Sequence, residues 1–174
     1  MGRVTGADAP RAPEPLTSTH DLSTFDCGAP ELDNWLRQRA LRNEEGGASR
    51  TYVACVGGQV IGFYGLATGA ISHTHASGRV RRNMPDPIPV MVLGRLAVDR
   101  NWHEQGIGRA LLRDAMLRTI QAADLAGIRA ILVHAKSLEA KAFYENCGLH
   151  SSPAEPLTLM VTIAEVRRLL GGEF

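Results

Sequence analysis

The stretch between residues 89 and 126 constrains the fold more than any other part of the chain. It starts with an apolar, β-branched run (PVMVLGRLAV, residues 89–98) and passes through a loop that holds Gly106 and Gly108. Beyond the loop, apolar residues recur at helical spacing up to about Ala126. Such a run is typical of a buried central strand, and two glycines permit a tight turn into a helix. The stretch therefore predicts a strand–loop–helix unit of an α/β domain.

The flanking segments predict the rest of one domain. A hairpin is expected around Gly57-Gly58, with a second strand that extends toward Ile71, and short strands are expected at 129–135 and 157–161. Helices are expected after Pro30, with Asp26 or Gly28 as cap, at 138–147 after a Ser137 cap, and after a capping box of Thr162 and Glu165. Residues 21–174 should form a single α/β domain, a mixed central sheet flanked by helices. Residues 1–20, rich in Pro, Ala, Thr and Ser, are expected to be a disordered tail.

Composition narrows the functional classes. The 174 residues are 44% hydrophobic, enough for one ordinary core, and they contain no apolar run long enough for a membrane helix. A cytoplasmic protein is expected. The three cysteines are widely separated, so neither disulfides nor a structural metal are predicted. The pair His73 and His75 is interpreted as a solvated loop pair, and His134 as a structural residue.

Positive charge is concentrated although the net charge is only +1. Between Arg37 and Arg95 eight arginines stand against three acidic residues, a local excess of five. Guanidinium groups suit phosphate oxygens, so this stretch is a candidate surface for a polyanion. A GC-rich genome would also favour arginine over lysine, but it would not explain the clustering.

The loop before the long helix suits a phosphate group. A glycine loop at a helix N-terminus presents backbone N–H groups and partial positive charge, which together bind a pyrophosphate. A dinucleotide fold fits poorly because Leu111 stands where the third glycine of that motif belongs. A nucleoside triphosphate loop would need a Gly-Lys-Ser/Thr sequence, which the chain lacks.

Three segments in this order resemble the cofactor motifs of the GNAT superfamily of N-acetyltransferases: LGRLAV (93–98), the glycine loop, and SLEAKAFYENCGL (137–149). The resemblance covers about residues 22–165 and implies acetyl-CoA as the cofactor. It implies that the backbone of residues 96–98 pairs with the pantetheine arm and that residues 103–108 surround the pyrophosphate. The cofactor-binding residues expected on this basis are Leu96, Ala97, Val98, His103, Glu104, Gln105, Gly106, Ile107, Gly108, Arg109, Ser137 and Phe143. His103 departs from the Gln or Arg usual in the family, and Ser137 from the usual Asn.

The resemblance also implies that Tyr144 is the general acid toward the leaving sulfur. A phenol has a pKa of about 10 and a thiol about 8.5, so a nearby Tyr can hydrogen-bond or protonate the departing thiolate. The alternative is that Phe143 and Tyr144 are only core aromatics of an amphipathic helix. No Glu or Asp stands out as a general base, and an α-amine is already partly neutral at cellular pH.

Further phrases, among them FDCG (25–28), SRT (49–51), PIPV (87–90) and HA (134–135), resemble the TacT-like toxins of bacterial type II toxin–antitoxin systems. That resemblance implies acetylation of the α-amine of aminoacyl-tRNA and neutralisation by a ribbon-helix-helix antitoxin, with a possible homodimer. The expected tRNA-binding residues are Arg37, Arg39, Arg42, Arg79, Arg81, Arg82 and Arg95. Three alternatives remain. The chain is a GNAT enzyme acting on a small amine or a protein N-terminus, a binding protein without enzymatic activity, or a protein that serves mainly as partner of a DNA-binding antitoxin.

Overall fold

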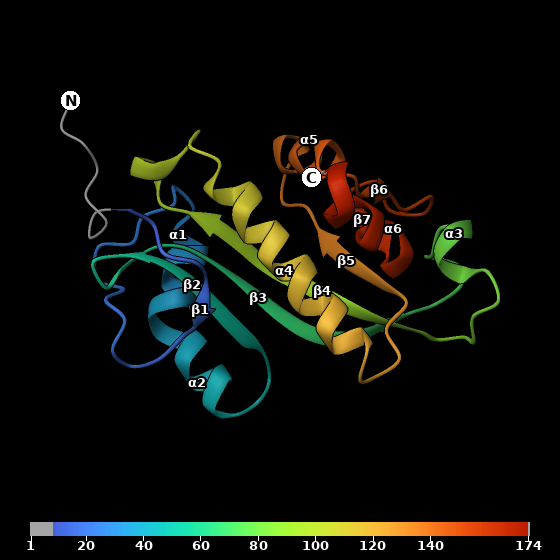
Figure 1. Cartoon of the computed structure of the whole chain (residues 1–174), viewed down its shortest axis with the longest axis horizontal. Coiled ribbons are helices and arrows are strands. Elements are labelled where there is room, and N and C mark those ends of the chain that lie inside the picture. The colour runs from blue at the N-terminus through green and yellow to red at the C-terminus, as the bar shows by residue number, and fades with distance from the viewer. Residues whose placement is uncertain (1–8, 174) are drawn as a thin grey trace. The chain divides into compact units, whose positions relative to one another are not determined.

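The computed structural model describes residues 9–173. Within them seven strands form one mixed sheet in the order β1-β2-β3-β4-β5-β7-β6, with helices between the strands (Figure 1). The strands are β1 (Glu14–Pro15), β2 (Arg50–Val56), β3 (Gln59–Ile71), β4 (Ile88–Val98), β5 (Ala130–His134), β6 (His150–Ser151) and β7 (Thr158–Thr162). The helices are α1 (Pro30–Trp35), η1 (Leu36–Ala40), α2 (Leu41–Glu45), α3 (Gly78–Arg81), η2 (Arg100–Trp102), α4 (Ile107–Ala123), α5 (Leu138–Asn146), α6 (Ile163–Arg168) and η3 (Leu169–Glu173). This confirms the predicted α/β class, and none of the described helices has the length and hydrophobicity of a membrane-spanning helix.

The chain forms two compact units, and β3, β4 and α4 contribute residues to both. The first unit contains the described residues up to Leu66 together with Arg95–Asp114. Its centre is the predicted hairpin, in which β2 and β3 pair antiparallel around Gly57 and Gly58. Both glycines have positive φ (57° and 81°), as a two-residue hairpin turn with right-handed twist requires.

The N-terminal segment corrects the sequence-based expectation in part. Glu14 and Pro15 pair with β2, the backbone N–H of Leu16 donates to Thr51 O at 2.9 Å, and the Leu16 side chain is 3% exposed. The edge of β2 thus supplies hydrogen bonds that offset the ordering of this stretch, and Leu16 adds apolar burial. Residues 1–8, the remainder of the predicted tail, lie outside the described residues.

The first helical segment packs the predicted face against the hairpin. Leu32, Trp35, Leu36 and Ala40 are all buried, and Trp35 stacks on Phe63 of β3 with ring centroids 6.0 Å apart. One π-helical turn, η1, separates α1 from α2. The expected cap is wrong: Ala29 is the N-cap without a side-chain bond, and Pro30 occupies the first turn.

The second unit contains Ala67–Gly94 and Ala115–Phe174. Here β4 runs parallel to β5, with pairs from Val90–Ala130 to Leu93–Val133, and β5 runs antiparallel to β7 (Figure 1). The predicted caps are confirmed, because the Ser137 side chain accepts from Ala140 N–H and Thr162 with Glu165 forms a capping box. Gly148, predicted to end the helix α5, has a φ of +102°. The sequence did not predict the two-residue strand β6.

Candidate active site

The loop between β4 and α4 is fixed at its start by a buried carboxylate. Asp99 is 6% exposed, and its Oδ1 accepts from Asn101 N–H at 2.9 Å while its Oδ2 accepts from Asp26 N–H at 3.1 Å. Arg100 donates to the Asp26 carboxylate at 2.9 Å. These bonds position the end of β4 independently of any ligand, so the loop that follows begins from a defined backbone.

The rest of the loop is exposed and bent. Glu104 and Gly106 have φ values of +62° and +79°, and residues 103–106 are solvent-exposed. A Cβ built on Gly106 would meet no atom within 4 Å, so its backbone has an open approach. The amides at the start of the 17-residue helix α4 come directly after it. The loop therefore has the open backbone and helix N-terminus that the phosphate interpretation requires.

Gly62 of β3 lets this region pack closely, a role that the sequence did not reveal. A Cβ at this position would lie 3.0 Å from a methyl group of Leu111 and 3.4 Å from Ala97 O. A larger residue here would have to displace the Leu111 side chain. A glycine inside an otherwise apolar strand was the only available signal.

The residues expected along the cofactor have different environments. Ala97 is 6% exposed and belongs to the core of the first unit, while Leu96 and Val98 are half-buried. The ring Nε2 of His103 is 2.7 Å from Val98 O, so this side chain is turned back onto the end of β4. Gln105 donates to Asn101 O at 3.4 Å, whereas Ile107 and Gly108 are half-buried and Arg109 is exposed.

Arg95 has the most unusual environment of the arginines in the first unit. Its guanidinium carbon lies 3.9 Å from the ring centroid of Trp35, a cation–π contact. Burial lowers the pKa of Arg95, and the nearby charge of Arg39 lowers it further. Within residues 9–173 no acidic side chain pairs with Arg95. Two cations in proximity with one of them half-buried are an arrangement that an anion would stabilise.

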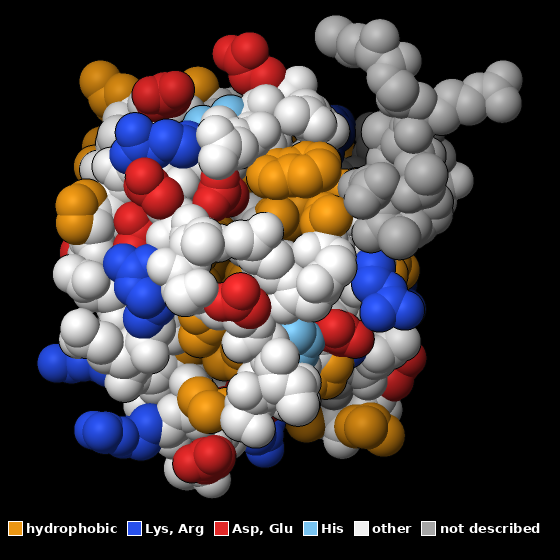
Figure 2. All heavy atoms as spheres, turned by 90° about the vertical axis from the view of Figure 1, so that its left-hand side faces the viewer, with side chains coloured by type: hydrophobic (Ala, Val, Ile, Leu, Met, Phe, Trp, Pro, Cys, Tyr) orange, Lys and Arg blue, Asp and Glu red, His pale blue; other side chains and the backbone are white. Residues whose placement is uncertain are grey.

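The other arginines of the first unit that were expected to bind a polyanion are exposed. Arg37 donates to Phe25 O at 2.7 Å, and for Arg39 and Arg42 no ion pair is found in the described part of the chain. Figure 2 shows that on one face Lys and Arg side chains occur at separate places, interspersed with Asp and Glu. That face is not uniformly basic, in agreement with the low net charge.

In the second unit Tyr144 is buried and points into protein rather than solvent. It is 6% exposed, and its ring packs edge-on against Phe143 with centroids 5.1 Å apart. Burial raises the pKa of Tyr144 to about 12, and Cys147 adds to the rise. The phenol is therefore protonated at any physiological pH. Ser137, expected near the cofactor, uses its hydroxyl oxygen to cap α5 at 3.1 Å.

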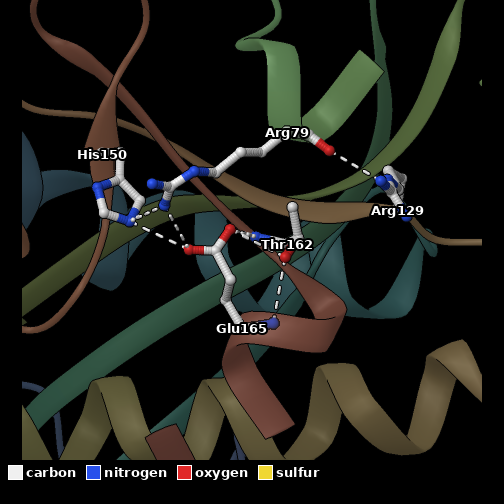
Figure 3. Close-up of polar contacts among 5 residues, drawn as sticks. All are labelled: Arg79, Arg129, His150, Thr162 and Glu165. Atoms are coloured by element: carbon white, nitrogen blue, oxygen red, sulfur yellow. Dashed lines mark hydrogen bonds and ion pairs between the residues drawn. The ribbon is translucent and has the colours of Figure 1, made fainter. Parts of the chain in front are cut away.

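The basic helix α3 is tied to its own unit through Arg79. Its guanidinium is 3.3 Å from the Glu165 carboxylate and 3.2 Å from His150 Nε2, and that ring nitrogen is itself 3.1 Å from Glu165 (Figure 3). Arg129 donates to the backbone carbonyls of Arg79 and Val80 at 2.8 and 3.1 Å. Burial raises the pKa of Glu165, but hydrogen bonds from Thr162 and the proximity of His150 outweigh it, and the net shift is downward.

The remaining arginines of this segment differ from Arg79. Arg81 and Arg82 are exposed, and no ion pair involves them within residues 9–173. The structure therefore divides the predicted basic cluster into one arginine that is neutralised by a carboxylate and two that face solvent.

The candidate metal-binding side chains have other partners. His73 Nε2 lies 2.9 and 3.0 Å from the carbonyl oxygens of Met84 and Pro85. Glu14, His20 and Cys55 do bring ligand atoms within 4.8 Å of one another, a cluster that the sequence did not reveal. Burial and the Glu14 charge raise the pKa of Cys55 to about 11. Within this cluster His20 Nε2 donates a hydrogen bond to Glu14 Oε1 at 2.9 Å.

This fold and glycine loop define an acyltransferase of the GNAT type. Residues 47–149 match the family model described as "Acetyltransferase (GNAT) domain", and the chain belongs to that family. It is thus an acetyl-CoA-dependent N-acetyltransferase.

The chain is also similar to toxins along nearly its full length. It is 51% identical over 97% of its length to the "tRNA-acetylating toxin" of Mycobacterium tuberculosis (strain ATCC 25618 / H37Rv), 99% of which is covered. It is 31% identical over 96% of its length to the "Probable toxin TacT" of Sinorhizobium fredii (strain NBRC 101917 / NGR234), 98% of which is covered. Among solved structures it resembles AtaT complexed with acetyl-methionyl-tRNAfMet, with a TM-score of 0.86, 27% identity, and coverage of 92% of this chain and 99% of that one.

Proposed function

We propose that this enzyme is a toxin that transfers the acetyl group of acetyl-CoA to the α-amine of an aminoacyl-tRNA and so blocks translation. The observation that carries the proposal is the 51% identity, over nearly the whole of both chains, to a tRNA-acetylating toxin. The likeness to AtaT complexed with an acetylated aminoacyl-tRNA supports the same acceptor. Since its substrate is the charged tRNA used in translation, the reaction takes place in the cytoplasm.

The glycine loop is the proposed binding site for the CoA pyrophosphate. Its open backbone at residues 103–108 and the N-terminus of α4 supply donors and partial positive charge. The backbone of Leu96–Val98, which lies beyond the last residue pair of β4 with β5, is proposed to pair with the pantetheine arm, and Arg109 adds a nearby cation. His103, which stands where the family usually has Gln or Arg, contacts Val98 O through its side chain and is proposed to hold the loop in place. Ser137 acts through the N-terminus of α5 that it caps, and Phe143 packs beside Tyr144.

Tyr144 is the proposed partner of the leaving sulfur. Bound acetyl-CoA supplies the activated acetyl thioester. With a pKa of about 12, raised first by burial, the phenol is a weaker acid than a free tyrosine. Complete proton transfer to a thiolate with a pKa near 8.5 is therefore unfavourable, and a hydrogen bond from Oη to the developing negative charge is the favoured role.

Arginines are the proposed contacts to the tRNA phosphates. Arg95 and Arg39 are neighbouring cations without an acidic partner in the described residues. Arg37 and Arg42 lie on the same helical segment as Arg39. In the second unit Arg81 and Arg82 are the stronger candidates, because Glu165 partly neutralises Arg79. A basic surface of limited extent explains how a protein of net charge +1 would bind a polyanion.

An antitoxin is the proposed protein partner. A mutant AtaT of known structure is bound to the C-terminus of the antitoxin AtaR and to acetyl-CoA, with a TM-score of 0.79 and 28% identity to this chain. We expect a corresponding antitoxin of the ribbon-helix-helix type for this chain, and a homodimer is compatible with the proposal. Expression of the enzyme alone should arrest bacterial growth, and co-expression with its antitoxin should abolish that arrest. Size-exclusion chromatography of the pair should give the composition of the complex.

The decisive experiment offers the purified enzyme labelled acetyl-CoA with several acceptors. Total aminoacyl-tRNA should become labelled, and mild alkaline deacylation should release the label as an N-acetyl amino acid. Uncharged tRNA is the matched control, because it has the same phosphates but no α-amine. Labelling of a polyamine or a peptide N-terminus instead of charged tRNA would favour the alternative acceptors and leave the acetyltransferase assignment intact.

Two substitutions test the assigned machinery. Tyr144→Phe should fold normally and lose about 10²- to 10³-fold in turnover, the usual cost of removing one hydrogen-bond donor to the developing negative charge. Gly108→Val should weaken CoA binding in calorimetry, whereas Gly127→Val, in the loop after α4 where a Cβ meets no atom within 4 Å, should leave CoA affinity unchanged. Unchanged turnover in the first variant or unchanged CoA affinity in the second would contradict the corresponding assignment.

A further inference from the structure

The second unit contains a pocket of about 230 Å³ with both apolar and polar lining residues. One wall is apolar and includes Val90, Val92 and Leu132, and His134 and Glu155 lie at its polar side. His75 is the third titratable residue of the lining. The expected role of His134 was structural, but in the structure this residue is exposed and lines the pocket.

Hydrogen bonds connect His134 to a carboxylate through one hydroxyl. Thr158 Oγ1 donates to Glu155 Oε2 at 3.1 Å, and His134 Nδ1 lies 2.9 Å from the same Thr158 oxygen. Because the hydroxyl has a single hydrogen and directs it to the carboxylate, Nδ1 of the imidazole must be the donor to Thr158. The neutral ring therefore carries its hydrogen on Nδ1 and a lone pair on Nε2.

The surrounding backbone holds this chain of bonds in place. Thr158 is 4% exposed and pairs with His134 across β7 and β5. Ser152 N–H donates to Thr158 O, and the Ser152 hydroxyl donates to His75 O, both at 2.7 Å. For Nε2 of His134 no hydrogen-bond partner occurs among residues 9–173. A basic nitrogen is thus preorganised at the edge of a pocket.

His134 lies where the parallel pairing of β4 with β5 ends. The parallel pairing of β4 with β5 ends at Leu93 and Val133, and His134 is the next residue of β5. Along β4, the segment proposed for the pantetheine arm begins three residues after Leu93.

We propose that His134 is the general base of the transfer, that its Nε2 accepts a proton from the acceptor ammonium group, and that Thr158 and Glu155 are positioning residues that fix its tautomer. This rests on the proposed function insofar as the acceptor is the α-amine of aminoacyl-tRNA. The apolar wall of the pocket disfavours the charged form of that amine, which assists the loss of its proton.

Protons and electrons balance across the transfer. The ammonium gives one proton to Nε2, and the neutral nitrogen then forms a bond with the thioester carbonyl carbon. The carbon–sulfur bond breaks with its electron pair going to sulfur, and the thiolate receives the hydrogen bond of Tyr144. The second proton of the nitrogen passes through solvent to the thiolate, and His134 returns its proton to solvent. The products are the amide, the free thiol of CoA and one proton.

The pH dependence of His134→Ala tests this role. An α-amine with a pKa of about 7.7 to 8.0 is mostly protonated at pH 7, so we expect kcat/KM to fall about tenfold or more there. The deficit should shrink toward none by pH 9, where the amine is neutral without a base. The acceptor is a 3′-amide-linked aminoacyl-tRNA, which resists alkaline hydrolysis. Added imidazole should partly restore the variant at pH 7.

Matched variants distinguish a general base at His134 from a residue that only stabilises the structure. His20→Ala, which removes another carboxylate-bonded histidine but one in the first unit, should leave the pH profile unchanged. Thr158→Val should lower kcat at pH 7, and Thr158→Ser, which keeps the hydroxyl, should restore it. A deficit in His134→Ala that is equal at pH 7 and pH 9 and insensitive to imidazole would overturn the proposal, as would unchanged activity.

Failure of the general-base proposal can be distinguished from failure of the aminoacyl-tRNA proposal. If wild-type enzyme acetylates a peptide or polyamine and not charged tRNA, the proposed acceptor is wrong. The same variants are then compared on the amine that is acetylated, and a pH-dependent deficit there still supports the role of His134.

Discussion

Arg95 in the first unit and Arg79 in the second show how one residue type in one basic stretch of sequence acquires two different environments. Arg95 stacks on Trp35 and has another arginine, Arg39, as its charged neighbour. Arg79 contacts the Glu165 carboxylate at 3.3 Å. The first environment penalises the positive charge and the second compensates it. A cation that lacks compensation is poised for an anionic ligand, whereas a compensated one stabilises the fold.

Substitution at Arg95 should have the largest effect on substrate binding. We expect Arg95→Ala to weaken aminoacyl-tRNA binding about 10- to 100-fold, because charge-assisted hydrogen bonds contribute about 1.5–3 kcal/mol. Arg79→Ala should weaken it less than about threefold. Filter binding at fixed salt measures both. Equal losses in the two variants would show that burial and pairing do not separate these arginines.

For the free energy of unfolding we expect the reverse of the order for tRNA binding. Loss of the Glu165–Arg79 contact in the second unit should destabilise the protein more than loss of Arg95 in the first. Glu165→Ala removes the capping box of α6 and the partner of Arg79, and we expect a loss of about 2 kcal/mol in the free energy of unfolding. Arg95→Met should leave that free energy unchanged or raise it, since it removes a partly desolvated charge. Urea titration provides both values, and a stable Glu165→Ala variant would contradict the structural role of this cluster.

A smaller effect is expected from the exposed arginines of the α3 segment. Removal of one cation that binds a phosphate should lower the salt slope of binding by roughly 0.7 to 0.9, so Arg81→Ala/Arg82→Ala should lower it by about 1.5. CoA affinity should not change. Adding Arg79→Ala to this variant should change the salt slope little. A further decrease of roughly 0.7 to 0.9 would show that Arg79 also binds a phosphate.

The smallest effect should be the acid sensitivity that Glu165 confers. Its pKa in the folded protein lies below the ordinary value, so its contribution is fully present above the unfolded pKa of about 4.5 and is lost as the pH falls through the folded one. Thermal unfolding of wild type and Glu165→Gln should therefore differ at pH 6 and converge toward pH 3. A constant difference over this range would assign the effect to the neutral cap alone.

Local patterns predicted most of the secondary structure but failed where distant contacts decide. The buried strand β4, the hairpin glycines and the caps at Ser137 and Thr162 follow from residues within a few positions of one another. The cap at Ala29 and the ordering of Leu16 were missed. Leu16 is ordered by a hydrogen bond to β2, and Ala29 packs against a core that includes residues of β2 and β3. Neither contact lies within a local window of the sequence.

The sequence by itself determined the α/β class, the glycine loop, and the order of motifs that identifies an acetyltransferase. Only the tertiary structure decided which charged and titratable side chains have partners. Glu165 lies 86 positions from Arg79 along the chain, and Thr158 lies 24 positions from His134. Electrostatic environment depends on distance in space and on burial, and strand pairing sets both, so neither composition nor spacing reveals it.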